Sequence, residues 1–158
     1  MKVVKGPPQN LIRLFISLDG VILVDTMSIT THIDSDRGIR FHIISGAVMP
    51  DVISSELSET LSRPDFDPTI PALWDVRDAE GSISAREIKA LAQLVGGLWK
   101  DQEPPRVALV VAPGLQYGLA RMYQQYADLA RKIEIQVFKE EEEAVAWLTS
   151  SPSQTDSP

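Results

Sequence analysis

The segment from Leu73 to Trp99 constrains the fold most, because it combines a buried strand, a polar turn and an amphipathic helix. Residues 71–76 are apolar and flanked by turn-forming residues, which is typical of a strand covered on both faces. Ser84 and Glu87 have the spacing of a capping box, which predicts that a helix begins at Ser84. Apolar residues then recur at helical spacing: Ile88, Leu91, Ala92, Val95, Leu98 and Trp99.

Strand and helix patterns alternate along the rest of the chain. Residues 28–34 and 39–48 alternate in polarity around a turn, which predicts two antiparallel strands. A helix is predicted from Pro50 to about Ser62, and the prolines of residues 64–71 end it. The remaining elements are predicted as strands over 106–111 and 133–138 and helices over 113–132 and 140–148. This order predicts an α/β sandwich of one sheet and its helices.

The two ends of the chain stand apart from this alternation. In residues 1–26, Asp19 and Gly20 join two apolar stretches, which predicts an edge hairpin with a two-residue turn. Alternatively, residues 1–26 are an extension that precedes a domain of residues 27–149. Arg13 and two prolines interrupt the N-terminal pattern and argue against a signal peptide. Residues 150–158 are polar and contain prolines, so a disordered tail is predicted.

Composition argues against several classes of partner. The net charge of −7 disfavours nucleic acid, because phosphate binding needs a positive surface. The absence of cysteine excludes disulfides, thiolate nucleophiles and cysteine metal sites, and it suits a reducing cytoplasm, which is the predicted location. The apolar runs are about five residues long, far short of the roughly 20 that cross a bilayer, so no membrane span is predicted.

The common catalytic signatures are missing. The sequence has no GxSxG, P-loop or GxGxxG motif. His32 and His42 each lie in a strand pattern without an HExxH motif, so no metal or cofactor is predicted. We therefore predict a non-catalytic protein. A hydrolase that uses Asp75 and a serine remains an alternative, and it would need a histidine or lysine base within about 3 Å of that serine.

Ser82 and Ser84 are candidate regulatory residues, because they lie at the predicted start of a helix. A phosphate there would meet free backbone N–H groups and the favourable end of the helix dipole. The alternative role of Ser84, as a helix cap, is the one that we expect first.

A second set of candidates lies near the carboxyl end of the predicted central strand, where α/β sheets usually bind ligands. Its members are Asp75, Arg77, Asp78, Tyr117 and Arg121, which we interpret as a rim for a ligand or partner. The alternatives are a structural network for the first three residues and plain surface placement for Tyr117 and Arg121. The aromatic residues and Met122 at helical spacing are interpreted as core; on the 113–132 helix this set is Leu119, Met122, Tyr123, Tyr126 and Leu129.

Four sequence features carry a resemblance to a known family. They are the strand ending Trp74-Asp75-Val76, the strand RVALVVAP, the helix opening YGLARMY, and the closing VFKEEEEAVAWL. On these, the chain from Met27 to Leu148 resembles the SpoIIAA-like proteins, relatives of the STAS (anti-anti-sigma) domain. The resemblance implies a single STAS-related α/β domain with a mixed sheet of about five strands and about four helices, mainly on one face.

The resemblance also implies a function. STAS switches are phosphorylated on a serine within a motif like Asp-Ser-Ser-Gly, whereas here no Asp directly precedes Ser82 or Ser84 and no Gly follows either. We predict a bacterial, non-catalytic regulatory or protein-interaction module, with a protein partner or self-association through the hairpin edge. The alternative is a carrier of a lipid or small molecule, for which an apolar pocket of about 300 Å³ or more between sheet and helices would argue.

Overall fold

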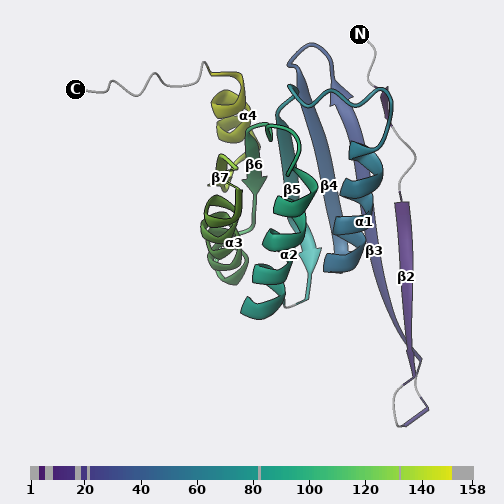
Figure 1. Cartoon of the computed structure of the whole chain (residues 1–158). Helices are drawn as coiled ribbons and strands as arrows, with labels where there is room; N and C mark the ends of the chain where they lie inside the picture. Colours follow the sequence, from purple (N-terminus) through teal and green to yellow (C-terminus); the bar gives the residue numbers. More distant parts are fainter. Residues whose placement is uncertain are drawn as a thin grey trace.

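One mixed sheet runs through the molecule, and every strand of the described residues belongs to it (Figure 1). The computed structural model describes residues 4–5, 9–16, 19–20, 22–81, 83–131 and 133–150. The strands are β1 (Val4–Lys5), β2 (Gln9–Ile16), β3 (Ile22–Asp34), β4 (Ile39–Ala47), β5 (Ala72–Glu80), β6 (Val107–Val110) and β7 (Ile135–Phe138). Their order across the sheet is β1-β3-β4-β5-β6-β7, with β2 also paired to β3.

The strands from β3 to β7 form the predicted five-stranded mixed sheet. β3 and β4 are antiparallel, whereas β4, β5, β6 and β7 are successive parallel neighbours. Parallel neighbours require crossover connections, which here contain helices. The helices are α1 (Pro50–Leu61), α2 (Ala85–Leu98), α3 (Leu115–Arg131) and α4 (Glu141–Thr149), the last of which follows β7. The predicted α/β class is confirmed.

The N-terminal strands extend this sheet beyond β3. β2 pairs antiparallel with β3, and five residues rather than the predicted two separate Ile16 from Ile22. The β3–β4 ladder ends where Met27 pairs with Gly46, so residues 22–26 pair with β2 alone. Gly46 has φ of +79°, and a Cβ there would collide with the Thr26 carbonyl. Because β3 runs continuously through residue 27, no break in structure marks the predicted domain start; the division itself stays a prediction.

Successive residues of β5 separate the two faces of the sheet. Leu73 packs in a cluster with Ala144 and Leu148 of α4, whereas the neighbouring Trp74 packs against the cluster that contains residues of α1, α2 and α3. This alternation follows from the period of two in a strand. Three helices therefore cover one face and α4 covers the other, which confirms the expectation of helices mainly on one face.

One strand boundary and one core position differ from the expectations. β5 continues to Glu80, four residues beyond the predicted strand, because its end pairs with residues 45–47 of β4 past a register shift. Leu129 of α3 is 83% exposed rather than core, whereas Ala127 is buried. Residues 151–158 of the predicted tail lie outside the described residues. In the described part of the chain, each helix is too short or too polar to cross a bilayer.

Candidate functional site

A cavity of about 180 Å³ lies between the sheet and helices α1, α2 and α3. Its lining is mostly apolar and includes Leu57, Trp74, Leu91, Val95, Trp99 and Leu109. The volume is below the roughly 300 Å³ that would argue for the predicted carrier of a lipid or drug-sized molecule. An engineered apolar cavity in another protein, with a similar volume of about 150 Å³, binds benzene. The cavity therefore has room for one small apolar group.

Arg40 borders this cavity although it is only 4% exposed. Its Nη2 donates to the carbonyl O of Asp67 at 3.2 Å, and its guanidinium lies 4.4 Å from the ring centroid of Phe66. Among the described residues, no carboxylate forms an ion pair with it. Burial lowers the pKa of Arg40, against the opposing effect of the Asp67 and Asp65 charges.

His42 is a second polar residue in the cavity wall, and it is 2% exposed. Its ring stacks on Trp74 with 4.1 Å between centroids, and its Nδ1 is hydrogen-bonded to Thr31 Oγ1 at 2.9 Å. Burial lowers the pKa of His42 to about 3, with smaller contributions from the charges of Arg40 and His32. The imidazole is therefore neutral near pH 7.

Tyr123 of α3 borders the same cavity and packs against the α1–α3 core cluster, as its predicted core position requires. Burial raises the pKa of its hydroxyl. The hydroxyl therefore stays protonated near pH 7.

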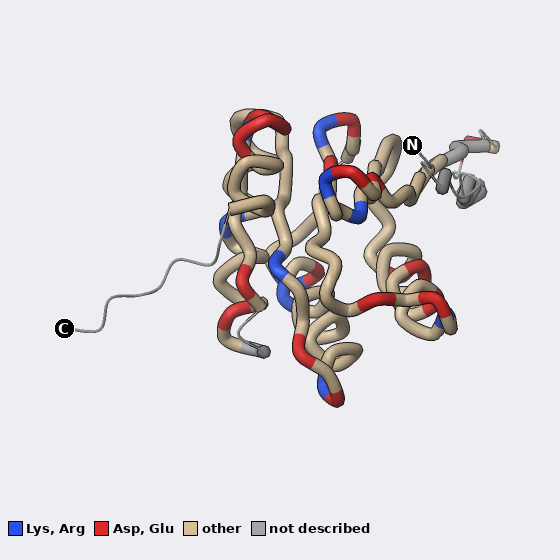
Figure 2. The backbone as a smooth tube through the Cα atoms, turned by 90° about the horizontal axis from the view of Figure 1, so that it is seen from above, with Lys and Arg blue, Asp and Glu red and all other residues tan. Residues whose placement is uncertain are grey.

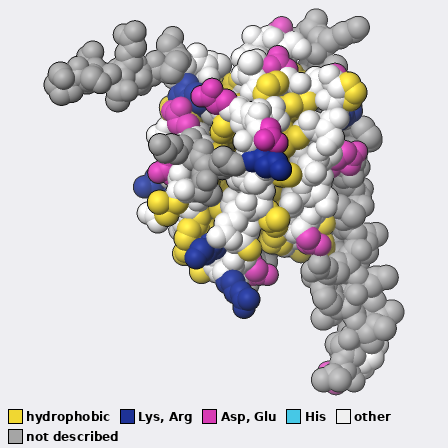
Figure 3. All heavy atoms as spheres, viewed as in Figure 1, with side chains coloured by type: hydrophobic (Ala, Val, Ile, Leu, Met, Phe, Trp, Pro, Cys, Tyr) yellow, Lys and Arg dark blue, Asp and Glu magenta, His cyan; other side chains and the backbone are white. Residues whose placement is uncertain are grey.

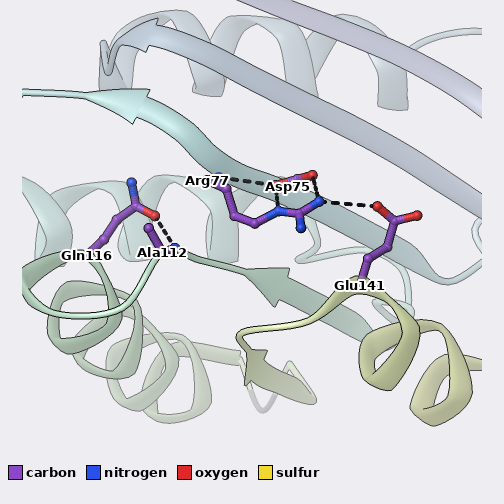
Figure 4. A network of polar contacts seen from close by, with 5 residues as sticks. All are labelled: Asp75, Arg77, Ala112, Gln116 and Glu141. Atoms are coloured by element: carbon purple, nitrogen blue, oxygen red, sulfur yellow. Dashed lines mark hydrogen bonds and ion pairs between the residues drawn. The ribbon is translucent and has the colours of Figure 1, made fainter.

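On the opposite face, Arg77 joins β5 to α4 in an ion-pair network with Asp75 and Glu141 (Figure 4). Its Nε and Nη2 donate to Asp75 Oδ1 and Oδ2 at 2.9 and 2.6 Å, and Nη2 lies 3.3 Å from Glu141 Oε2. Burial raises the pKa of Asp75, but the hydrogen bonds from Arg77 outweigh it and hold that pKa below its usual value. Hydrogen bonds to Asp75 raise the pKa of Arg77. The guanidinium of Arg77 therefore has two carboxylate partners.

The other predicted rim residues lie outside this network. Asp78 is exposed on β5, where it pairs in register with Ser45. Tyr117 lies under the Lys139 ammonium, 5.1 Å from Nζ to the ring centroid. Arg121 donates to Gln124 Oε1 at 2.8 Å within α3. The structure thus brings Asp75 and Arg77 together and gives Tyr117 and Arg121 separate partners.

Gln116 borders the cavity and joins the loop after β6 to β5, and Figure 4 shows its contact with Ala112 of that loop. Its Oε1 accepts from the Ala112 N–H at 2.7 Å, and its Nε2 donates to the Ala79 carbonyl at 3.1 Å. Both ends of this amide are therefore held, which fixes the start of α3 against the sheet.

The family comparison agrees with this architecture. The model of the SpoIIAA-like family matches residues 52–149, more than half of the 158-residue chain. The chain belongs to the SpoIIAA-like family. The match begins within α1, so Arg40 and His42 of this SpoIIAA-like protein precede the matched segment. No curated protein and no solved structure matches the chain.

In this SpoIIAA-like chain, Ser84 forms the predicted capping box of α2. Its Oγ accepts from the Glu87 N–H at 3.2 Å, and Glu87 Oε2 accepts from the Ser84 N–H at 2.7 Å. The hydroxyl therefore contacts no histidine or lysine base in the described residues, and nothing supports Ser84 as a hydrolase nucleophile. Ser82, the other candidate, lies outside the described residues.

Sequence reasoning predicted apolar residues of the cavity wall as core, but it missed the polar wall residues Arg40 and His42. A period-two pattern places Arg40 and His42 on the same face as Ile44, and that face of a helix-covered strand is buried. A charged residue at such a position was the available signal. Within the described residues, no group of three or more acidic or histidine side chains has metal-binding geometry.

Proposed function

We propose that this SpoIIAA-like chain is a non-catalytic regulatory module that binds a small apolar molecule in the cavity between the sheet and α1–α3. The cavity supports the ligand-binding part of the proposal, and family membership supports the regulatory part. Of the two functions predicted from the sequence, the proposal takes the regulatory role from the first and the apolar ligand from the second.

The size of the cavity is the observation that carries the proposal. Protein interiors contain few voids larger than a water molecule. An empty cavity of about 180 Å³ would destabilise the fold by about 4 kcal/mol, at about 24 cal/mol per Å³. A ligand that fills it recovers contacts that the walls otherwise lack. Because α1, α2 and α3 all border the cavity, filling it changes the packing of three helices at once.

The charge distribution supports an uncharged or singly charged small ligand, or a protein partner, over nucleic acid. The net charge is −7, and acidic and basic residues are interspersed in the view of Figure 2. Figure 3 shows scattered hydrophobic groups on the α1–α3 side. Single exposed residues such as Leu94 and Leu115 are common on protein surfaces and identify no partner site. The cytoplasmic location stays a prediction.

A cavity-filling variant tests the ligand-binding part. Ala120 borders the cavity, so Ala120→Leu is expected to fill it, while Ala90→Leu adds the same atoms at an exposed position of α2. Toluene is the probe, followed by thermal unfolding and by native mass spectrometry. We expect toluene to raise the Tm of the wild type and Ala90→Leu by several degrees and to leave Ala120→Leu unchanged. Equal responses of all three proteins would contradict the proposal.

Self-association through β2 is a second candidate, because one specific observation favours it. β2 lies at the edge of the sheet, and residues 22–26 pair with β2 alone. A two-stranded ribbon is marginally stable by itself, and an exposed edge accepts a further strand. Sedimentation equilibrium should then report a dimer, which Leu14→Lys should weaken because edge lysines block strand pairing. A monomer at every concentration would exclude this candidate.

A further inference from the structure

Arg40 is the buried arginine of the described residues, and its partners do not neutralise its charge. Buried charges are normally paired with an opposite charge, because taking an ion out of water costs several kcal/mol. Within the described residues, its guanidinium forms one hydrogen bond, from Nη2 to a neutral carbonyl, and no ion pair with a carboxylate. The ring of Phe66 contributes a cation–π contact but no formal charge.

The charges of Asp67 and Asp65 favour protonated Arg40, but neither carboxylate forms an ion pair with it. Asp67 Oδ1 accepts from the backbone N–H and the hydroxyl of Thr69, at 2.9 and 2.6 Å. Asp65 forms an exposed ion pair with Arg63, at 3.8 Å. The exposed Arg77, in contrast, has two carboxylate partners. The cavity face therefore holds a buried cation that forms no direct ion pair in the described part of the chain.

We propose that Arg40 binds the carboxylate of a small apolar acid whose hydrocarbon part occupies the cavity. This inference rests on the proposed ligand-binding function and specifies its ligand class. Arg40 and the apolar walls border one continuous cavity, so a single molecule reaches both. A guanidinium presents paired N–H groups that match the two oxygens of a carboxylate.

The lining also limits the size and charge of the acid. A cavity of about 180 Å³ holds a hydrocarbon part of about six to eight carbon atoms. Among the described residues that line the cavity, Arg40 is the one arginine or lysine, so the lining can balance a single negative charge. Glu80, which also lines the cavity, further disfavours the second charge of a dianion such as a phosphate monoester. The neutral His42 and the Tyr123 hydroxyl offer hydrogen bonds but no further charge. The geometry therefore selects a monocarboxylate.

Heptanoate and 1-heptanol are matched probes that differ only in the charged end. Trp74 and Trp99 border the cavity, so tryptophan fluorescence and calorimetry can both follow binding to the full chain. We expect heptanoate to bind the wild type about 10- to 100-fold more tightly than 1-heptanol, the range for hydrogen bonds to a charged group. Arg40→Met should remove this preference and leave the affinity for 1-heptanol unchanged. Arg77→Met removes a charge from the opposite face and should keep the preference.

The outcomes separate the inference from the proposed function. Equal affinities of the wild type for the two probes would overturn the role of Arg40 and leave the cavity function standing. Binding of neither probe would overturn the cavity function and the inference with it. An equal loss of preference in Arg77→Met and Arg40→Met would also overturn it, because net charge alone would then explain the effect. Since the comparison of probes uses the wild type, it decides the question even if Arg40→Met does not fold.

Discussion

The two faces of the sheet differ in how an arginine is paired. On the α4 face, the charges of Asp75, Arg77 and Glu141 are linked across β5 and α4. The far end of α4 is held too, because Arg106 Nη1 donates to the Ser150 carbonyl at 3.0 Å. On the cavity face, Arg40 has a single side-chain hydrogen bond beside a void of about 180 Å³. The first arrangement holds α4 on the sheet. In the second, Arg40 lies beside the cavity without a carboxylate partner among the described residues.

Both faces of the sheet combine small residues with aromatic rings. The α4 face contains Ala108 and Trp147, and the α1–α3 face contains Ala127 and Trp99. Side-chain size therefore does not separate the two faces. They differ in that the apolar cavity lies on the α1–α3 side, which is the side suited to the proposed ligand.

The largest expected effect is the loss of stability when a packed leucine on either face is replaced by alanine. Leu73→Ala removes a side chain that is 0% exposed in the α4 cluster, and we expect it to lower the free energy of unfolding by about 3–5 kcal/mol. Leu91→Ala, on the cavity wall, should cost about 2–3 kcal/mol, because Leu91 already lacks neighbours on one side. Urea denaturation measures both. Equal losses would show that the two faces are packed alike.

The second effect is a difference between the two faces in how the free energy of unfolding depends on pH. The pKa of His42 falls from 6.5 in the unfolded chain to about 3 in the fold, where burial and the charges of Arg40 and His32 disfavour protonation. Between these values the unfolded chain binds the extra proton, so stability falls with falling pH by about 1.4 kcal/mol per unit. The pKa of Asp75 lies below 3.8, so its contribution is lost only at lower pH.

The measurement is urea denaturation at pH 7 and pH 4.5. We expect the wild type to lose about 2–3 kcal/mol more between these values than His42→Gln, which cannot take up the proton. Asp75→Asn should lose as much as the wild type, because pH 4.5 lies above the window of Asp75. A His42→Gln variant that matches the wild type would show that His42 titrates normally.

The sequence predicts local features of the fold better than contacts between residues that are far apart in the chain. Ser84 and Glu87 mark the start of α2, and Pro50 marks the start of α1, because caps and prolines act locally. The pairing of Asp75 with Arg77 is likewise local, two residues apart on one strand. Glu141 is 64 residues from Arg77, and only the fold brings them together. The buried state of Arg40 depends on α1–α3 covering that face, and its local signal is the period-two pattern that it shares with Ile44.

The third effect removes one arginine from each face. Arg77→Met should lower the free energy of unfolding by about 1 kcal/mol at most, since an exposed ion pair contributes little. Arg40→Met should leave it unchanged or raise it, because an apolar side chain of similar volume avoids burying a charge. Thermal and urea unfolding without ligand measure both. If Arg40→Met lowers the free energy of unfolding by more than Arg77→Met does, the Arg40 guanidinium is already stabilised by partners within the protein. That outcome would weaken the case for a bound acid.

The smallest effect concerns α2, a wall of the cavity that begins at Ser84. Ser84→Ala removes the hydroxyl that accepts from Glu87 N–H and should cost about 0.5–1 kcal/mol in urea denaturation. Ser84→Asp keeps a capping oxygen and adds charge at the favourable end of the helix dipole, so its stability should equal that of the wild type.

The pair of variants therefore separates a cap from a switch. If Ser84 is only a helix cap, neither variant should change the native mass or the capture of partners. If Ser84 is a phosphorylation site, Ser84→Asp alone should change the native mass or the capture of partners, and its stability should equal that of the wild type. Because Ile88 and Leu91 of α2 border the cavity, a shift of this helix would also alter heptanoate affinity. An Ser84→Asp protein with wild-type mass, partners and heptanoate affinity would remove Ser84 from the regulatory proposal and leave the cavity as its basis.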